Sequence, residues 1–252
     1  MTNDVVYNIV LLASLGLAAI VFVSLFFVDA PYGRHTRKGW GPTIGDKVGW
    51  IVMEAPSPLL LAAYYFWGRP RTVTSLVFLI MWETHYLYRA FLYPLRVRDS
   101  RGRMPLSVVA MGALFNVMNA YLNGRYLFML SDSHPWTWLA DPRFVLGLGL
   151  FGLGMLVNRR ADRRLLDLRQ ERGDTYRIPE GGLYRWISCP NYFGEIVEWL
   201  GWALATWSLS GLAFAAWTAA NLAPRARANH RWYLETMPDY PPERKALLPG
   251  VW

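Results

Sequence analysis

Long apolar runs separated by short polar segments dominate the chain. A helix needs roughly 20 apolar residues to cross the hydrocarbon core of a bilayer. Runs of about this length occupy 5–28, 48–67, 73–93, 106–130 and, more briefly, 144–157. A sixth run, 193–223, is long enough for one tilted helix or for a tight hairpin broken near 208–211. The pattern predicts an all-α integral membrane protein with six or seven spans.

The charge between the runs decides between six and seven. Lys and Arg concentrate in four segments, which carry three, four, eight and five of them: 29–44, 94–105, 158–190 and 224–252. Segment 131–142 instead carries two Asp and neither Lys nor Arg. Loops rich in Lys and Arg stay on the cytoplasmic side, and the four segments share one side only if the sixth run is a hairpin. We therefore expect seven transmembrane helices, with the N-terminus outside and the C-terminus in the cytoplasm.

Composition agrees with a membrane protein. The 252 residues are 54% hydrophobic and 17% charged, which is too little charge for an ordinary soluble domain. The net charge is +8, and the basic residues that produce it lie between the apolar runs. Membrane topology therefore explains them better than nucleic-acid binding does. The first run has no basic start and no cleavage site, so we interpret it as a retained span. With no repeat or linker in the chain, residues 1–252 are expected to form one domain and a monomer in the bacterial inner membrane or the endoplasmic reticulum.

Two polar stripes at helical spacing flank the basic segment: Asn158, Asp162 and Arg169, and then Asn191, Glu195 and Glu198. A solvated helix with i,i+4 pairs would explain the first stripe by itself. The second stripe begins an apolar run, where carboxylates are costly unless they are paired or face a polar cavity. Two such stripes predict a site, and the eight arginines of segment 158–190 suit a phosphate-rich cofactor.

Further polar side chains lie within the second and third runs. Glu54 precedes two prolines, and Tyr86 has Glu83 and Arg89 one helical turn away, while His85 points to another side. A tyrosine hydroxyl that shares a hydrogen bond with Glu54 can donate to a substrate carbonyl. The alternative is that Tyr86 only packs and that Glu83 pairs with Arg89.

Two other patterns do not indicate ligand sites. Gly147, Gly149 and Gly152 match a dinucleotide fingerprint, but they lie inside an apolar run with no preceding strand, which predicts close helix packing. The four histidines show no helical or short-loop pairing, and Cys189 is the single cysteine. We therefore expect no metal site and no internal disulfide.

Three longer segments carry a distinctive pattern: RIPEGGLY at 177–184, NYFGEIVEWLGWALATWS at 191–208 and HRWYLETMPDYPPERKALLP at 230–249. Shorter ones lie at 32–36, 50–57, 85–91 and 101–103. In these segments the chain resembles the steroid 5α-reductase family, integral membrane enzymes that reduce the Δ4 double bond of 3-oxo-steroids with NADPH. The resemblance implies seven helices around a cavity that opens to the cytoplasm.

The resemblance also implies roles for individual residues. Glu54 and Tyr86 match the pair that holds the steroid 3-carbonyl, and Trp50 lies with them on the substrate side. The implied cofactor positions are Tyr32, Arg89, Tyr93, Arg101, Arg103, Asn158, Asp162, Arg169, Arg177, Asn191, Glu195, Arg225 and Tyr233. In the implied reaction Tyr86, oriented by Glu54, donates to the carbonyl while hydride from NADPH reaches C5. The substrate is then a steroid or steroid-like membrane lipid.

Other functions remain open at this point. A reductase of a polyprenol or enoyl-CoA is the nearest alternative. A membrane methyltransferase of the isoprenylcysteine type has a similar C-terminal half, but S-adenosylmethionine carries no phosphate for the arginines to bind. A proton-coupled transporter would also explain the carboxylates in the membrane, and it predicts no NADPH binding.

Overall fold

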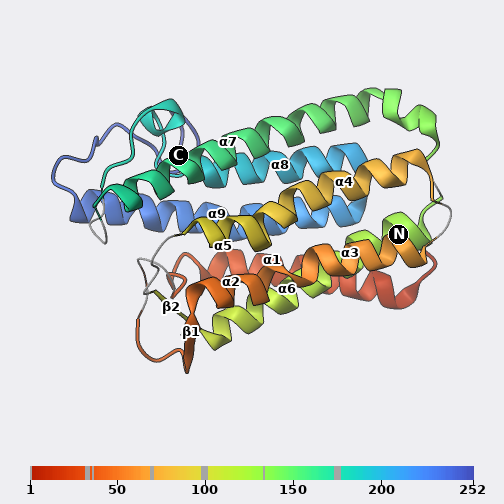
Figure 1. The fold of residues 1–252 in the computed structure, drawn as a ribbon, viewed down its shortest axis with the longest axis horizontal. Coiled ribbons are helices and arrows are strands. Elements are labelled where there is room, and N and C mark those ends of the chain that lie inside the picture. The colour runs from red at the N-terminus through yellow and green to blue at the C-terminus, as the bar shows by residue number, and fades with distance from the viewer. Residues whose placement is uncertain are drawn as a thin grey trace.

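The structure is a computed structural model that describes residues 2–31, 35, 37–68, 71–97, 102–132, 134–172 and 177–252, without the side chains of 169–172. These residues form an elongated helical bundle (Figure 1). The helices are, in chain order, α1 (Val5–Ser24), α2 (Asp46–Glu54), α3 (Pro56–Trp67), α4 (Val73–Leu87), α5 (Tyr93–Arg96), α6 (Leu106–Arg125), α7 (Pro142–Arg172), α8 (Pro190–Thr206) and α9 (Leu209–Thr236). Shorter elements are the strands β1 (Thr43–Gly45) and β2 (Arg103–Pro105), π-helical turns at Tyr88–Leu92 and Tyr126–Leu130, and 3-10 turns at Trp136–Ala140 and Gly182–Arg185.

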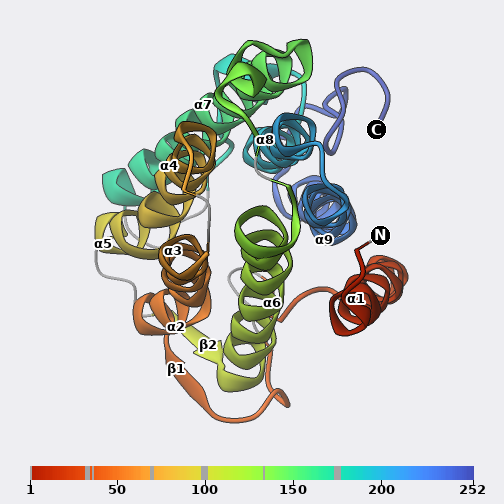
Figure 2. The same cartoon turned by 90° about the vertical axis from the view of Figure 1, so that its right-hand side faces the viewer.

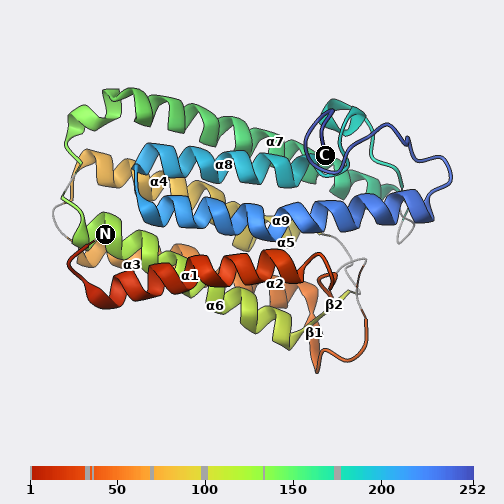
Figure 3. The same cartoon turned by 180° about the vertical axis from the view of Figure 1, so that it is seen from behind.

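The helices pack side by side along the bundle axis. α7 runs along α8, α8 along α9, and α3 along α6, while α1 lies at the outside against α9 and α6 (Figure 3). Seen down the bundle, α6 lies between α3 on one side and α1 and α9 on the other (Figure 2). Strands β1 and β2 pair antiparallel and tie the start of α2 to the start of α6. Side chains on α6 therefore face several other helices.

The second apolar run is two helices rather than one. α2 ends at Glu54 and α3 begins at Pro56, because proline at that position has no N–H to continue the hydrogen-bond ladder. Asn116 of α6 donates to the carbonyl of Met53 at 2.9 Å at this break. The break therefore leaves Glu54 at the end of a helix inside the bundle.

The sixth run is the hairpin that the charge pattern predicted. α8 ends at Thr206, Trp207 adopts a left-handed conformation with φ 46°, and the Ser208 hydroxyl caps α9 by accepting from the Gly211 amide at 3.0 Å. α9 then continues through Pro224 to Thr236, so part of the expected tail is helical. The fifth run is likewise longer than its apolar stretch of 144–157, because α7 spans 31 residues.

Glycines allow α7 and α8 to approach closely, as expected, but only Gly147 of the three fingerprint glycines lies at the contact. A Cβ on Gly147 would lie 2.4 Å from the Ala205 nitrogen, and one on Gly154 would lie 2.3 Å from the Glu198 nitrogen. Gly149 and Gly152 have nothing within 4 Å of such a Cβ. The contact therefore uses glycines seven residues apart, on one face of α7.

The fold is that of an all-α membrane protein. Three described helical segments are long and apolar enough to cross a membrane: Val5–Ser24, Leu106–Leu130 and Pro142–Leu168. Their apolar side chains face outward as well as inward, since Val5 is 68% exposed and Leu114 is 69% exposed. Outward apolar faces of this extent are stable against lipid rather than water.

Candidate active site

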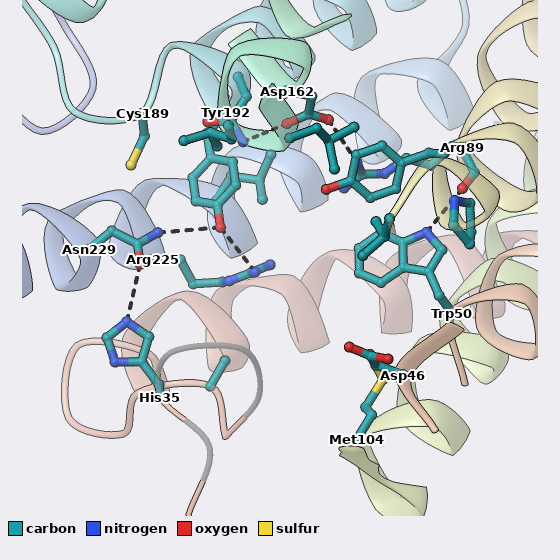
Figure 4. Close-up of a pocket in the computed structure, with 18 of the residues that line it drawn as sticks. His35, Asp46, Trp50, Arg89, Met104, Asp162, Cys189, Tyr192, Arg225 and Asn229 are labelled. Atoms are coloured by element: carbon teal, nitrogen blue, oxygen red, sulfur yellow. Dashed lines mark hydrogen bonds and ion pairs between the residues drawn. The ribbon is translucent and has the colours of Figure 1, made fainter. Parts of the chain in front are cut away.

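A pocket lies near the end of the bundle that carries the C-terminus, among α2, the π-helical turn after α4, α7, α8 and α9 (Figure 4). Both arginines and carboxylates line it, next to aromatic and apolar side chains. Seven residues expected from the sequence line this pocket: Trp50, Arg89, Tyr93, Asp162, Asn191, Arg225 and Tyr233. The pocket therefore joins residues from both halves of the chain.

A hydrogen-bonded network joins the two predicted stripes. Asn191 donates to Asp162 at 3.0 Å, and Asn158 donates to the Asn191 carbonyl at 3.0 Å and to Glu195 at 3.3 Å. Arg89 donates to the other Asp162 oxygen at 3.1 Å and lies 3.9 Å from Glu195. Asn158 and Asp162 are 3% and 2% exposed. Two residues of each stripe, Asn158 and Asp162 on α7 and Asn191 and Glu195 on α8, thus face each other, and Arg89 lies beside both carboxylates.

Arg89 belongs to the π-helical turn that follows α4. Its guanidinium lies over the Trp50 ring at 4.7 Å and over the Tyr93 ring at 5.2 Å. The Trp50 indole donates to the Arg89 carbonyl at 3.0 Å. These contacts turn Arg89 toward α7 and α8, so its pairing with Glu83, the alternative considered from the sequence, is wrong.

Polar side chains of α8 and α9 form a second cluster in the pocket. Arg225 donates to Asn221 at 3.0 Å and to the Tyr192 hydroxyl at 3.1 Å, and Asn229 donates to the same hydroxyl at 3.4 Å (Figure 4). His35, which follows α1 in the chain, lies 3.1 Å from the Asn229 side-chain oxygen. This contact holds His35 against α9 at the pocket.

The C-terminal segment packs beside this cluster. The Ser188 hydroxyl lies 2.7 Å from His230 Nδ1 and 2.6 Å from the Tyr240 hydroxyl. The Tyr233 ring stacks on Tyr240, with centroids 4.8 Å apart. Burial lowers the pKa of His230, as does the nearby Lys245, and burial raises the pKa of Tyr240. The neutral imidazole is therefore the form that the fold favours.

Glu54 and Tyr86 lie deeper in the bundle and do not line the pocket. Adjacent turns of α6 hold them. Asn116 donates to Glu54 at 3.3 Å, and the Asn119 amide nitrogen lies 3.5 Å from the Tyr86 oxygen. The structure describes no hydrogen bond between Glu54 and Tyr86; a separate amide of α6 contacts each side chain, and their joint action on a carbonyl stays a prediction.

His85 and Glu198 form a buried pair that the sequence did not indicate. His85 Nδ1 lies 2.9 Å from Glu198 Oε1, and the side chains are 6% and 0% exposed. Glu198 therefore turns toward α4, although it shares a stripe with Glu195, which faces α7. The expectation that Glu198 acts together with Asn191 and Glu195 is wrong in this respect.

The remaining predicted cofactor residues lie elsewhere or outside the described residues. Arg103 is exposed on β2 and donates to the Thr43 hydroxyl and carbonyl, both at 2.7 Å. Arg177 follows α7 and is not among the residues that line the pocket. Tyr32, Arg101 and the Arg169 side chain lie outside the described residues.

Sequence reasoning missed two groups of residues. His35, Tyr192 and Asn229 line the pocket, and no local pattern connects them because each comes from a different element. Asn119 and Asn123 are different, because together with Asn116 they recur at i, i+3 and i+7 within an apolar run. That spacing puts three amides on one helix face and was a readable signal.

Comparison with known proteins identifies the family. Residues 102–252 match the family model described as 3-oxo-5-alpha-steroid 4-dehydrogenase. Steroid 5-alpha-reductase DET2 of Gossypium hirsutum is 42% identical over 258 residues, covering 100% of this chain and 99% of that protein. Human 3-oxo-5-alpha-steroid 4-dehydrogenase 1 is 40% identical over 225 residues, covering 88% of this chain and 86% of that protein.

These relatives confirm the resemblance read from the sequence, and they match nearly the whole chain. The family model also covers both polar stripes and the C-terminal segment that packs beside the pocket. The chain therefore belongs to the 3-oxo-5-alpha-steroid 4-dehydrogenase (steroid 5α-reductase) family and is an oxidoreductase that acts on CH–CH groups.

Proposed function

We propose that this chain uses NADPH to reduce the Δ4 double bond of a 3-oxo-steroid, giving the 5α-dihydro-3-oxo-steroid. The names of its relatives supply the reaction class. The observation that supports the proposal is that Glu54 of α2 and the buried Tyr86 of α4 both meet amides on adjacent turns of α6, next to a pocket lined with arginines. This arrangement supports a group that would bind the substrate carbonyl beside a pocket that would hold an anionic cofactor.

The donor set of the pocket fits a phosphorylated dinucleotide. Guanidinium groups of Arg89 and Arg225 and the amide of Asn191 suit phosphate and ribose oxygens. The aromatic face of Tyr93 suits the rings of the cofactor, and Trp50, which lines the same pocket, would contact the substrate. These residues would hold NADPH, and the arginines favour it over NADH because the 2′-phosphate adds negative charge.

The other cofactor positions remain part of the proposal on the family pattern: Tyr32, Arg101, Arg103, Asn158, Asp162, Arg169, Arg177, Glu195 and Tyr233. The network described above gives Asn158, Asp162 and Glu195 a supporting role, since they fix Asn191 and Arg89.

NADPH, when bound, would supply the hydride that is added at C5 of the steroid. Tyr86 would donate a hydrogen bond to the steroid 3-oxygen, which gains negative charge during the reaction. Glu54, held by Asn116, can donate to the same oxygen in its neutral form. The buried aromatic cluster around Tyr86, including Trp82 and Trp199, would exclude water from this oxygen. A proton from water would complete the product at C4.

We further propose a single domain that crosses the membrane seven times as a monomer, with its pocket on the cytoplasmic side. The N- and C-termini lie near opposite ends of the bundle (Figure 1), which supports an odd number of spans. The pocket lies at the end where α7 and α9 carry their arginines, which supports a cytoplasmic placement.

The direct test is NADPH oxidation by the purified protein in detergent, with and without progesterone, followed by mass analysis of the steroid. We expect an NADPH-dependent gain of two mass units. Tyr86→Phe should lower kcat roughly 10²–10³-fold, because it removes a donor to the developing oxyanion, while the Kd for NADPH stays the same. Glu54→Gln should act in the same direction.

Tyr88→Phe is the matched control, because Tyr88 is also buried and lies two residues further along the chain. Its kcat should match that of the wild type. Equal loss of turnover and NADPH affinity in Tyr86→Phe would remove Tyr86 from the mechanism. NADPH binding without steroid reduction would favour a polyprenol or enoyl-CoA substrate. Without NADPH binding, the methyltransferase or the transporter would replace the reductase.

A further inference from the structure

A line of hydrogen-bonding side chains runs from α8 through α6 to Tyr86. Trp202 Nε1 donates to Asn123 Oδ1 at 2.9 Å, and Asn123 Nδ2 donates to Asn119 Oδ1 at 3.0 Å. Asn119 Nδ2 in turn lies 3.5 Å from the Tyr86 hydroxyl oxygen. Trp202 and Asn123 are 0% exposed, and Asn119 and Tyr86 are 3% exposed. The four groups therefore meet away from bulk water.

The indole at the far end fixes the direction of every donor. A tryptophan N–H can only donate, so Asn123 must present its carbonyl to Trp202 and its NH2 group to Asn119. Asn119 then accepts on its own carbonyl and points its NH2 group at the Tyr86 oxygen. The buried Ser57 hydroxyl is a second neighbour of the Tyr86 oxygen, and it too can donate to that oxygen. The phenol proton is thus left for a substrate.

We propose that Trp202, Asn123 and Asn119 form a directional hydrogen-bond relay and act as positioning residues for Tyr86. This inference rests on the proposed function, in which Tyr86 donates to the steroid 3-oxygen. Hydrogen bonds in a chain polarise one another, so a phenol oxygen that accepts a hydrogen bond is a stronger donor. The 3.5 Å contact would shorten as charge builds on Tyr86, because catalytic hydrogen bonds often tighten only during the reaction.

Packing alone does not account for these residues. Asn119 and Asn123 lie in the apolar run 106–130, and burying an amide costs free energy unless its hydrogen bonds are made. A leucine of similar volume would fill either position without that cost. The Asn123 NH2 group also donates to the Asn119 backbone carbonyl at 3.1 Å. The Asn119 NH2 group, in contrast, has no other acceptor among the described residues than the Tyr86 oxygen, so the value of the relay lies at the end that reaches Tyr86.

A double-mutant cycle tests the relay. Asn119→Leu removes the last donor, and Trp202→Phe removes the indole N–H that sets the direction. We expect kcat to fall about 10-fold in Asn119→Leu and about 3-fold in Trp202→Phe, with an unchanged Kd for NADPH. In a Tyr86→Phe background both substitutions should have little further effect, because phenylalanine has no oxygen for the relay to act on.

Trp217→Phe is the matched control, since the Trp217 indole donates to the Ser14 hydroxyl at 3.0 Å outside the relay. Its kcat should match that of its parent in both backgrounds. The relay is overturned if Asn119→Leu lowers kcat by the same factor in both backgrounds, or not at all; if that variant does not fold, Trp202→Phe decides alone. Full activity of Tyr86→Phe would instead remove the proposed role of Tyr86, and the relay with it.

Discussion

Individual polar side chains in this bundle take their roles from the partners that other helices supply. Glu195 and Glu198 lie three residues apart on α8, yet Glu195 faces Asn158 on α7 and Glu198 faces His85 on α4. Arg89 likewise has a possible partner, Glu83, six residues earlier in the chain and pairs instead with Asp162. At this scale a carboxylate in the membrane is tolerated because a specific cation or amide meets it.

The Arg89–Asp162 pair yields a stability prediction. Asp162→Asn leaves the largely buried Arg89 without its nearest carboxylate, so we expect the free energy of unfolding to fall by about 3 kcal/mol. NADPH binding should weaken as well, since Arg89 and Asn191 lose the group that orients them. Thermal unfolding in detergent and an NADPH titration would measure both.

Asp141→Asn is the control for Asp162→Asn, because Asp141 also pairs with an arginine, at 2.9 Å from Arg143, but at the surface. Exposed pairs contribute little, so its unfolding should resemble that of the wild type. Similar losses in the two variants would contradict the view that the buried pair organises the site.

At the scale of whole elements, the packing of α7 against α8 depends on how closely the two helices approach each other. Gly154→Ala would place a Cβ 2.3 Å from the Glu198 nitrogen and 2.5 Å from the Gly194 carbonyl, both backbone atoms that cannot turn away. The helices must then separate, which we expect to cost about 1–3 kcal/mol of stability. The added methyl should also weaken NADPH binding, because Asn158 and Asn191 meet across the same interface.

Gly149→Ala is the matched control on the same helix, since nothing lies within 4 Å of its Cβ. It should keep or slightly raise the unfolding temperature, because alanine favours helix more than glycine does. The two variants can be compared by thermal unfolding under one set of conditions. If Gly149→Ala were the more damaging, the packing described for α7 and α8 would be wrong.

The contact between α9 and the C-terminal segment should respond to pH. Burial holds the pKa of His230 below its ordinary value of 6.5, so the folded protein keeps the imidazole neutral beside Ser188. As pH falls below 6.5, the unfolded chain binds a proton that the folded chain does not, and stability decreases until pH passes the folded pKa. The unfolding temperature should therefore drop more between pH 7.5 and 5.5 in the wild type than in His230→Gln. Parallel curves would contradict this.

The whole molecule places its basic segments at one end of the bundle. The C-terminal ends of α5 and α7 and the C-terminal half of α9, which carry arginines, lie there, while the 3-10 turn before α7, in an acidic segment, lies at the other end (Figures 1 and 3). Positive charge holds such an end on the cytoplasmic side of a membrane. The orientation in the membrane therefore depends on where the assembled bundle places its basic residues.

Topology can be checked with single cysteines in a Cys189→Ala background. A cysteine at Thr2 or Trp136 should react with a membrane-impermeant maleimide in intact cells, whereas one at Arg163 or Glu243 should react only after the membrane is opened. The first pair lies at one end of the proposed seven-span fold and the second pair at the other. Labelling of all four in intact cells would contradict the orientation, and labelling of Thr2 without Trp136 would contradict the number of spans.

The sequence by itself determined the apolar helices, the hairpin at 208–211, the facing stripes of α7 and α8 and the family, because helical period, charge and motifs are local properties. Several outcomes required the tertiary structure: α9 continuing through Pro224, the glycines at the α7–α8 contact, the pair of His85 with Glu198, and the separate support of Glu54 and Tyr86 by α6. Each depends on which helix faces which, and side chains far apart in the chain become partners only after the helices have packed.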